Sequence, residues 1–127
     1  MVEERIEGQP VFNQPAGHLE EGESLLEAVI RETREETAWR FVPEAHTGIY
    51  RWVHPGNGET FIRHCYAGSV CDHQPEQALD EGILRACWLS REQLVVQQNL
   101  RSPLVLHCID DYLAGQRYPL ELTKDLT

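Results

Sequence analysis

A recurring set of charged residues between positions 17 and 39 constrains this chain more than any other feature. The pattern is G-x5-E-x7-R-E-x2-E-E, and its fixed positions are Gly17, Glu23, Arg31, Glu32, Glu35 and Glu36. Residues 24 to 37 are predicted to form a helix, because Ser24 and Glu27 have capping-box spacing and apolar residues recur at helical intervals. The motif therefore lies on a loop followed by a helix.

The helix brings three carboxylates together. At about 3.6 residues per turn, Glu32, Glu35 and Glu36 share one face, and the apolar residues, such as Leu26 and Val29, share another. Like charges at this spacing cost about 0.2–0.5 kcal/mol per pair, so a purely structural helix gains nothing from them. A divalent cation reverses that repulsion, because Mg²⁺ and Mn²⁺ prefer hard oxygen ligands and Mg²⁺ commonly joins carboxylates to phosphates. The carboxylate face therefore predicts a metal-dependent enzyme that hydrolyses phosphoanhydrides. The alternative is a solvated Glu-rich helix, which would not explain why Gly17, Glu23 and Arg31 also stand at the fixed positions of the motif.

Composition narrows the class of protein. A length of 127 residues predicts one domain, 1–127, with a modest core. The net charge of −10 argues against binding to a nucleic acid polymer. We expect a cytoplasmic protein without a membrane association, since no apolar run is long enough to span a bilayer and no signal peptide is visible. The four cysteines are far apart in sequence and are expected to be free thiols.

The rest of the chain predicts alternating strands and helices of one α/β unit. Short strands are expected at 11–12 and 85–89, a hairpin at 41–53 and 60–70 around the turn 54–58, helices from Ser90 and over 103–114, and a surface tail at 118–127.

The charged motif resembles the Nudix box, the signature of the Nudix hydrolase family. The segments 13–20, 99–105 and 115–121 resemble a subgroup of bacterial phosphatases within it. The resemblance implies an α/β/α sandwich with a mixed sheet, Mg²⁺ or possible Mn²⁺ dependence, and a small-molecule nucleotide or pyrophosphate substrate. For the subgroup it implies release of phosphate from nucleoside di- and triphosphates, and action on hydroxymethylpyrimidine pyrophosphate and thiamine pyrophosphate.

The resemblance also implies roles for single residues. The expected metal ligands are Glu32, Glu35, Glu36 and the carbonyl oxygen of Gly17. Arg31 would pair with Glu23 and hold the loop and helix in shape. The general base would be Glu32 or Glu81, and we favour Glu32.

Substrate contacts are predicted at five positions, each with a structural alternative. Arg63 could bind phosphate or form a cross-strand ion pair. Trp52 could stack on a base. His18 could face the substrate or be a plain loop residue, and Asn13 and Gln14 could hydrogen-bond a ring or stabilise a local turn.

The sequence departs from the family at two places. Ala38 stands where a Gly usually ends the helix, which predicts a left-handed residue at a cost of about 1 kcal/mol. The family normally has a strand, a turn and most of a second strand before the position of Met1, so we expect the first strands to be missing and an edge and core to be exposed. A monomer or a strand-exchanging homodimer would follow.

Two other functions remain open from the sequence. One is a Nudix hydrolase for another nucleotide, such as an oxidised nucleoside triphosphate or ADP-ribose. The other is a non-catalytic nucleotide-binding domain on the same fold, which would typically lack the motif carboxylates that are present here.

Overall fold

Strands and helices alternate along the chain in the computed structural model, which describes residues 1–126. The strands are β1 (Val2–Ile6), β2 (Gln9–Asn13), β3 (Arg40–Val53), β4 (Thr60–Cys71) and β5 (Ile83–Ala86). The helices are α1 (Leu25–Thr37), α2 (Arg91–Val95), α3 (Leu104–Leu113) and the 3-10 helix η1 (Leu120–Leu122). No helix within residues 1–126 is long and apolar enough to cross a membrane.

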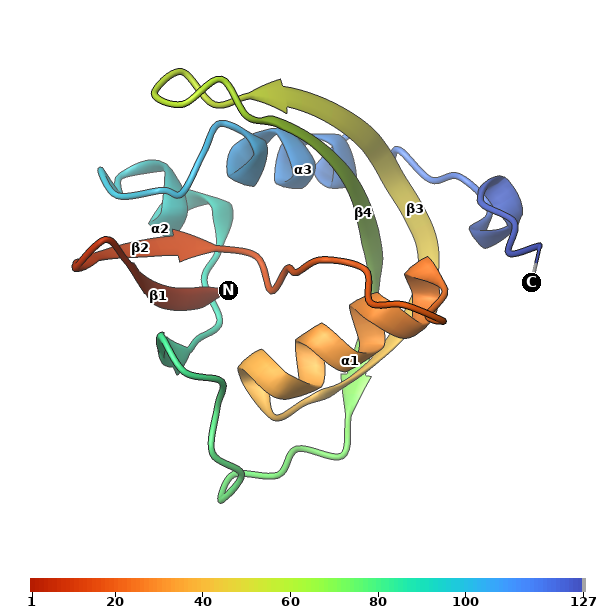
Figure 1. Ribbon diagram of the computed structural model, residues 1–127, viewed down its shortest axis with the longest axis horizontal. Helices are drawn as coiled ribbons and strands as arrows, with labels where there is room; N and C mark the ends of the chain where they lie inside the picture. Colours follow the sequence, from red (N-terminus) through yellow and green to blue (C-terminus); the bar gives the residue numbers. More distant parts are fainter. Residues whose placement is uncertain (127) are drawn as a thin grey trace.

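Two antiparallel sheets form the framework. The first has the order β2-β1-β5, and the second is the long hairpin β3-β4. The hairpin curves around α1 and α3, so that α3 lies near its turn and α1 near its open end (Figure 1). Parallel pairing within the described residues is limited to an isolated bridge between Phe12 and Leu100, so the expected mixed sheet takes the form of two small sheets.

Helix α1 begins and ends at the residues that the sequence indicates. The Ser24 side chain accepts a hydrogen bond from the backbone N–H of Glu27, and the Glu27 side chain accepts one from Ser24 in return. Ala38 ends the helix in the left-handed conformation, with φ of 63°. The left-handed backbone predicted at Ala38, with its strain, is therefore present at the end of α1. At the other end, the capping box of Ser24 and Glu27 fixes the preceding loop to the first turn of α1.

The first residues of the chain form a strand that the sequence analysis did not predict. Strand β1 lies between β2 and β5, and Val2 at its start is fully buried. Charged residues fill the middle of β1, which hides the usual alternation of a half-buried strand. Its pairing to β5, more than seventy positions away in sequence, stabilises it.

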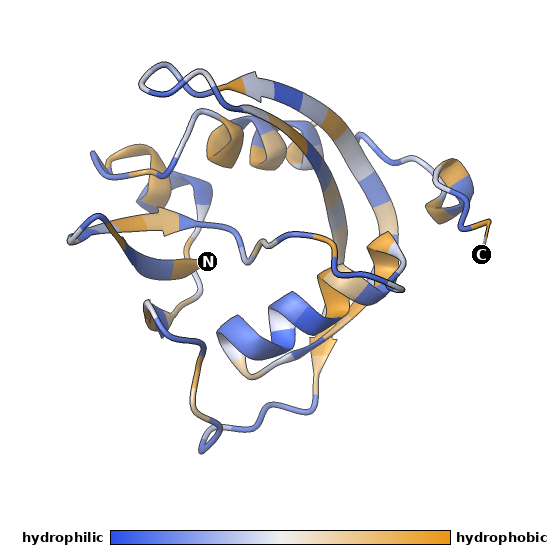
Figure 2. Ribbon diagram, in the orientation of Figure 1, coloured by the Kyte–Doolittle hydropathy of each residue, from blue (hydrophilic) through white to orange (hydrophobic). Residues whose placement is uncertain are grey.

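The outer edge of β4 has no neighbouring strand among the described residues. This is an unpaired edge of the kind expected from the sequence, and a cavity described below follows it. Hydrophobic residues gather along β2 and at the starts of α3 and α1, the later turns of α1 are hydrophilic, and β3 alternates between the two (Figure 2). Val105 and Cys108 on α3 are almost fully buried, so α3 packs tightly against the framework beside this edge.

Candidate active site

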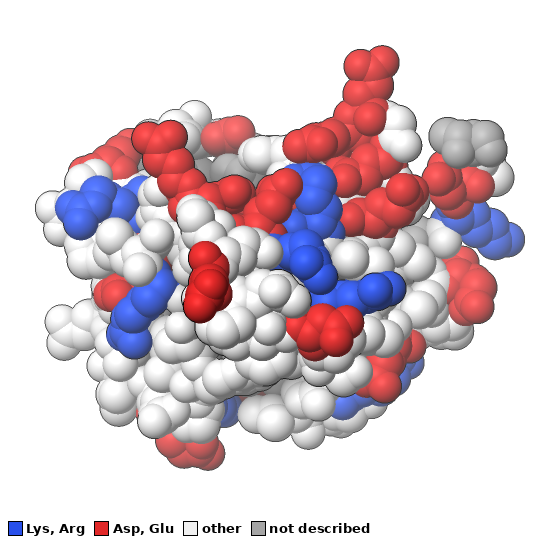
Figure 3. Space-filling model, turned by 90° about the horizontal axis from the view of Figure 1, so that it is seen from below, with Lys and Arg blue, Asp and Glu red and all other residues white. Residues whose placement is uncertain are grey.

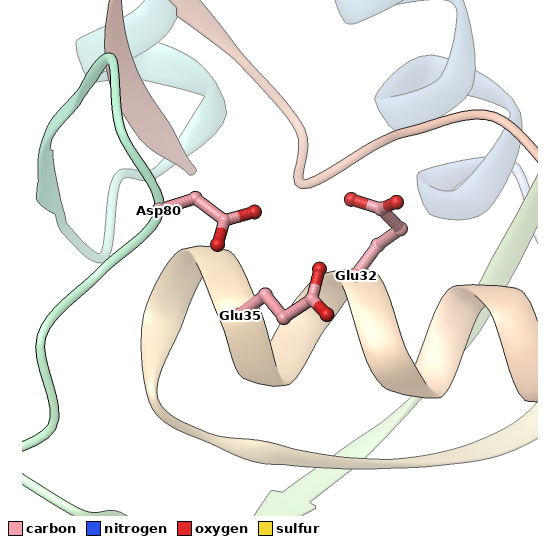
Figure 4. A group of neighbouring side chains, drawn as sticks. All are labelled: Glu32, Glu35 and Asp80. Carbon is pink, nitrogen blue, oxygen red and sulfur yellow. The ribbon is translucent and has the colours of Figure 1, made fainter.

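Three carboxylates from two segments point into one space. Glu32 and Glu35 come from α1, and Asp80 comes from the loop before β5 (Figure 4). One oxygen atom from each of them lies within 4.8 Å of the others. The backbone N–H of Asp80 donates a hydrogen bond of 3.0 Å to the carbonyl oxygen of Glu35, which fixes the loop against the helix.

The loop residue in this group is Asp80 and not Glu81, the residue named by the sequence analysis. Glu81 is exposed and lies outside the group. The backbone hydrogen bond to α1 decides which of the two neighbouring acids faces the helix. The only signal in the sequence is that this loop is acidic, and Asp80 and Glu81 share that property. The sequence therefore could not show which of the two faces the helix.

Glu36 is the most buried of the three helix carboxylates. It is only 6% exposed, and its Oε1 atom accepts a hydrogen bond of 3.3 Å from the backbone N–H of Ala16. Burial raises the pKa of the Glu36 carboxyl, and a hydrogen bond with Glu32 raises it further. The three helix carboxylates therefore adjoin one another: Glu32 and Glu35 join Asp80, and the Glu36 carboxyl contacts Glu32 beneath the loop that precedes α1.

Arg31 connects this group to the preceding loop. It contacts Glu23 through two hydrogen bonds of 2.6 and 3.0 Å, which is the pairing expected from the sequence. Its Nη1 atom donates to Glu32 at 2.7 Å and to Glu35 at 3.1 Å, and its Nη2 atom donates to the His18 carbonyl oxygen at 3.2 Å. Figure 3 shows acidic side chains gathered around basic ones on this side of the molecule. The arrangement holds the carboxylates in place despite their mutual repulsion.

Gly17 allows the loop to lie directly on the carboxylate group. A Cβ atom at this position would overlap the carboxylate of Glu32. A residue with any side chain would therefore displace either the loop or Glu32. The glycine of the motif is explained by this close approach of backbone to side chain.

The residues present fit a divalent cation. The donors are hard oxygen atoms from three carboxylates, which is the set that Mg²⁺ and Mn²⁺ prefer. Burial raises the pKa of Glu35, and the neighbouring charge of Asp80 adds to that shift. The part of the Glu35 shift that comes from Asp80 reflects repulsion between like charges, which a bound cation would relieve.

A cavity of about 1100 Å³ lies beside the carboxylate group. Its walls include Glu32, the loop from Asn13 to Leu19, part of α3 and ten consecutive residues of β4, from Phe61 to Val70. Because consecutive residues of β4 line it, the open edge of that strand faces the cavity. The volume is slightly above the range of about 300–1,000 Å³ that is typical of small-molecule sites, so a small ligand fits inside it.

Arg63 is held inside this cavity by the two amides that precede the motif. Its guanidinium donates to Gln14 Oε1 at 3.0 Å and to Asn13 Oδ1 at 3.2 Å. Gln14 Nε2 in turn donates to the carbonyl oxygen of Val105 at 2.8 Å. Both amide groups are neutral, so these two hydrogen bonds orient the charge of Arg63 without neutralising it. The amide oxygens predicted to contact a ligand ring are thus engaged with Arg63.

The other two substrate candidates also line the cavity. Trp52 lies at the end of β3 beside Phe61, with ring centroids 5.6 Å apart. His18 is exposed in the loop above Glu32, and its backbone carbonyl is already bound by Arg31. The structure therefore brings all five predicted contacts to one cavity.

Comparison with known proteins agrees with this geometry. A family model for the NUDIX domain matches residues 2–106. The chain belongs to the Nudix family. Phosphatase NudJ of Escherichia coli strain K12 is 42% identical over 125 residues, which cover 98% of this chain and 81% of NudJ. Phosphatase NudJ of Shigella flexneri matches to the same extent.

A solved Nudix structure has the same fold. The NUDIX hydrolase from Nitrosomonas europaea superposes with a TM-score of 0.95 at 47% identity, covering 98% of this chain and 85% of that one. The α/β Nudix fold and the hydrolase class predicted from the sequence are confirmed. The Nudix motif of this chain is the segment that carries Arg31, Glu32 and Glu35, against which Asp80 is placed.

Proposed function

We propose that this Nudix hydrolase cleaves phosphoanhydride bonds of nucleoside di- and triphosphates and of thiamine-related pyrophosphates, with Mg²⁺ or Mn²⁺ as cofactor, and releases phosphate. The observation that carries the proposal is the group of Glu32, Glu35 and Asp80 at the rim of a cavity that contains Arg63. The similarity to the NudJ phosphatases supports the choice of substrates.

The residues of the group would hold the cation. A bound divalent cation supplies charge stabilisation for phosphate oxygens and a more acidic water. Glu32, Glu35 and Asp80 are its proposed ligands, and Glu36 and the Gly17 carbonyl stay candidates from the sequence. Glu36 is proposed to support Glu32 from beneath, because its carboxyl hydrogen-bonds both Glu32 and the backbone of the loop.

The chain's own residues would position the reacting groups. Arg31 keeps Glu32 and Glu35 oriented through its hydrogen bonds. Of the two bases considered from the sequence, Glu32 lies in the group and Glu81 lies outside it, which favours Glu32 as the residue that takes a proton from water. Catalysis would then consist mainly of positioning and electrostatic stabilisation.

Substrate binding would use the opposite wall of the cavity. Arg63 is proposed to bind a phosphate of the substrate, because its charge is oriented but not neutralised by Asn13 and Gln14. Trp52 is proposed to stack on the base or pyrimidine ring, and His18 to face the substrate from the loop. We further propose a cytoplasmic enzyme that acts as a monomer or homodimer.

The test is a measurement of released products over a panel of nucleotides and thiamine precursors. We expect orthophosphate from nucleoside diphosphates in the presence of Mg²⁺, no release after chelation, and loss of release in Glu32→Gln. Wild-type turnover in Glu32→Gln would contradict the proposed site. Pyrophosphate as the main product would favour the alternative of an oxidised nucleoside triphosphate substrate, and release of ribose phosphate would favour ADP-ribose.

A non-catalytic nucleotide-binding domain is the remaining alternative. It predicts tight nucleotide binding without turnover of any member of the panel. The presence of all the motif carboxylates disfavours it.

A further inference from the structure

Two cysteines from different elements meet at the wall of the cavity. Cys65 lies on β4 and Cys108 lies on α3, and both line the cavity. Cys108 is 2% exposed, and Cys65 is half-buried. Each thiol is the leading influence on the pKa of the other, which indicates that the two side chains are neighbours although the residues are far apart in sequence.

Helix α3 is fixed on both sides of Cys108. One turn before it, the carbonyl oxygen of Val105 accepts the hydrogen bond from Gln14 at 2.8 Å. One turn after it, Asp111 accepts a hydrogen bond of 2.6 Å from the Tyr50 hydroxyl on β3. Tyr50 lies two residues from Gly48, the residue paired with Cys65. These contacts keep the helix in register with the hairpin and hold the two thiols together.

The surroundings give the two thiols different roles. The hydrogen bond from Cys108 lowers the pKa of Cys65, and the nearby Arg63 guanidinium lowers it further. The same hydrogen bond and burial raise the pKa of Cys108. Cys65 is also the less buried of the two, so it is the thiol that a molecule in the cavity can reach, and Cys108 is the thiol beside it.

We propose that Cys65 and Cys108 form a reversible disulfide when the protein meets a low-molecular-weight disulfide. The Cys65 thiolate attacks one sulfur of that disulfide, forms a mixed disulfide and releases one small thiolate. Cys108 then loses its proton and attacks the sulfur of Cys65, which forms the Cys65–Cys108 bond and releases the second small thiolate. The two cysteines are oxidised by two electrons, and the small disulfide is reduced to two thiols.

The bond would join β4 to α3 next to Arg63. Arg63 and Cys65 are two residues apart on β4, so their side chains lie on the same face of the strand. Oxidation removes the sulfur's negative charge from beside the guanidinium. This inference is independent of the proposed function, because it needs only the two thiols and the cavity through which an oxidant reaches Cys65.

The test uses the wild-type protein and oxidised glutathione. We expect the loss of two free thiols, an intact mass lower by two hydrogen atoms, and a cross-linked peptide pair that contains Cys65 and Cys108. A reducing agent should restore both thiols. Retention of all thiols, or a disulfide that joins either residue to Cys71 or Cys87, would overturn the proposal.

A variant separates the two steps. Cys108→Ser cannot complete the exchange, so Cys65 should keep a glutathione adduct that the wild-type protein does not accumulate at that position. Cys71→Ser, at an exposed cysteine outside the pair, is the matched control and should still form the bond. A lasting adduct on Cys65 in the wild-type protein would show that Cys108 does not act as the second thiol, and would overturn the proposal.

Discussion

The backbone N–H of Asp80 donates a hydrogen bond to the carbonyl oxygen of Glu35. Together with the hydrogen bond from Gln77 Nε2 to the carbonyl oxygen of Arg34, this contact joins the loop before β5 to α1 near the end of the helix. It places the carboxylate of Asp80 beside those of Glu32 and Glu35. The group therefore depends on a residue that lies more than forty positions beyond the recognised motif.

Asp80→Asn tests this assignment. Loss of one charged ligand should weaken the apparent affinity for Mg²⁺ or Mn²⁺ by about 10–100-fold, the scale on which groups around a bound metal act. Metal titration of the phosphate-release rate would measure the change. The matched control is Glu81→Gln, which removes the adjacent exposed acid and should leave the titration unchanged. If the two variants behave alike, Asp80 is not a ligand.

Gly17→Ala should reduce activity strongly. The added methyl group meets the carboxylate of Glu32, so the loop or the side chain must move. We expect a loss of about 1–3 kcal/mol in the free energy of unfolding, together with a lower phosphate-release rate. Gly22→Ala is the control, because its φ of 78° makes alanine strained there while no atom lies within 4 Å of the added Cβ. It should lose stability and keep the rate; an inactive Gly22→Ala variant would contradict the specific role of Gly17.

Arg63→Lys should separate substrate binding from the chemical step. Lysine has one nitrogen in place of the two guanidinium nitrogens that donate to Gln14 and Asn13, so its charge is no longer held in the same orientation. We expect KM for a nucleoside diphosphate to rise about tenfold, the equivalent of about 1.4 kcal/mol, with a smaller change in kcat. Arg51→Lys, at an exposed arginine of β3, should change neither value. A tenfold fall in kcat with an unchanged KM would contradict a role of Arg63 in substrate binding.

Ser24→Ala should destabilise the fold without altering the site chemistry. It removes the side-chain oxygen that accepts from the N–H of Glu27 at 3.1 Å. Loss of such a cap costs about 1 kcal/mol. Urea denaturation would measure this, and Ser69→Ala at an exposed position of β4 provides the control. No difference between the two variants would mean that the cap contributes little to stability.

The reactivity of Cys65 should depend on pH. The hydrogen bond from Cys108 lowers the pKa of Cys65 to about 7. A lowered thiol pKa increases the thiolate fraction at neutral pH, so alkylation at Cys65 should rise as pH increases and reach half of its maximum near pH 7. Peptide-resolved alkylation rates between pH 5 and about 9 would measure it. The reaction should need higher pH in Cys108→Ala, which lacks a side-chain donor, and an unchanged profile there would contradict the stated cause.

The sequence predicts the elements that local spacing determines. Helix α1 and its cap follow from Ser24, Glu27 and the apolar period, and the hairpin follows from the turn at 54–58. These signals lie within a few residues of one another, so no distant contact is needed to interpret them. The pairing of Arg31 with Glu23 was expected from the family resemblance, and the structure contains it.

Distant contacts determine what the sequence could not predict. Strand β1 exists because β2 and β5 flank it, although its own residues are mostly charged. Asp80 rather than Glu81 joins the carboxylates because of one backbone hydrogen bond. Asn13 and Gln14 turn toward Arg63, about fifty positions away, and no local pattern reveals that partnership.

Arg31 gives the carboxylate group a built-in counter-ion. Its guanidinium already touches Glu32 and Glu35, so folding alone assembles these ligands, and no later rearrangement of the helix is required to gather them. An arriving cation must share these oxygens with a positive charge that is covalently part of the enzyme. The competition with Arg31 lowers the affinity of the carboxylates for the cation. The cation can therefore exchange between turnovers.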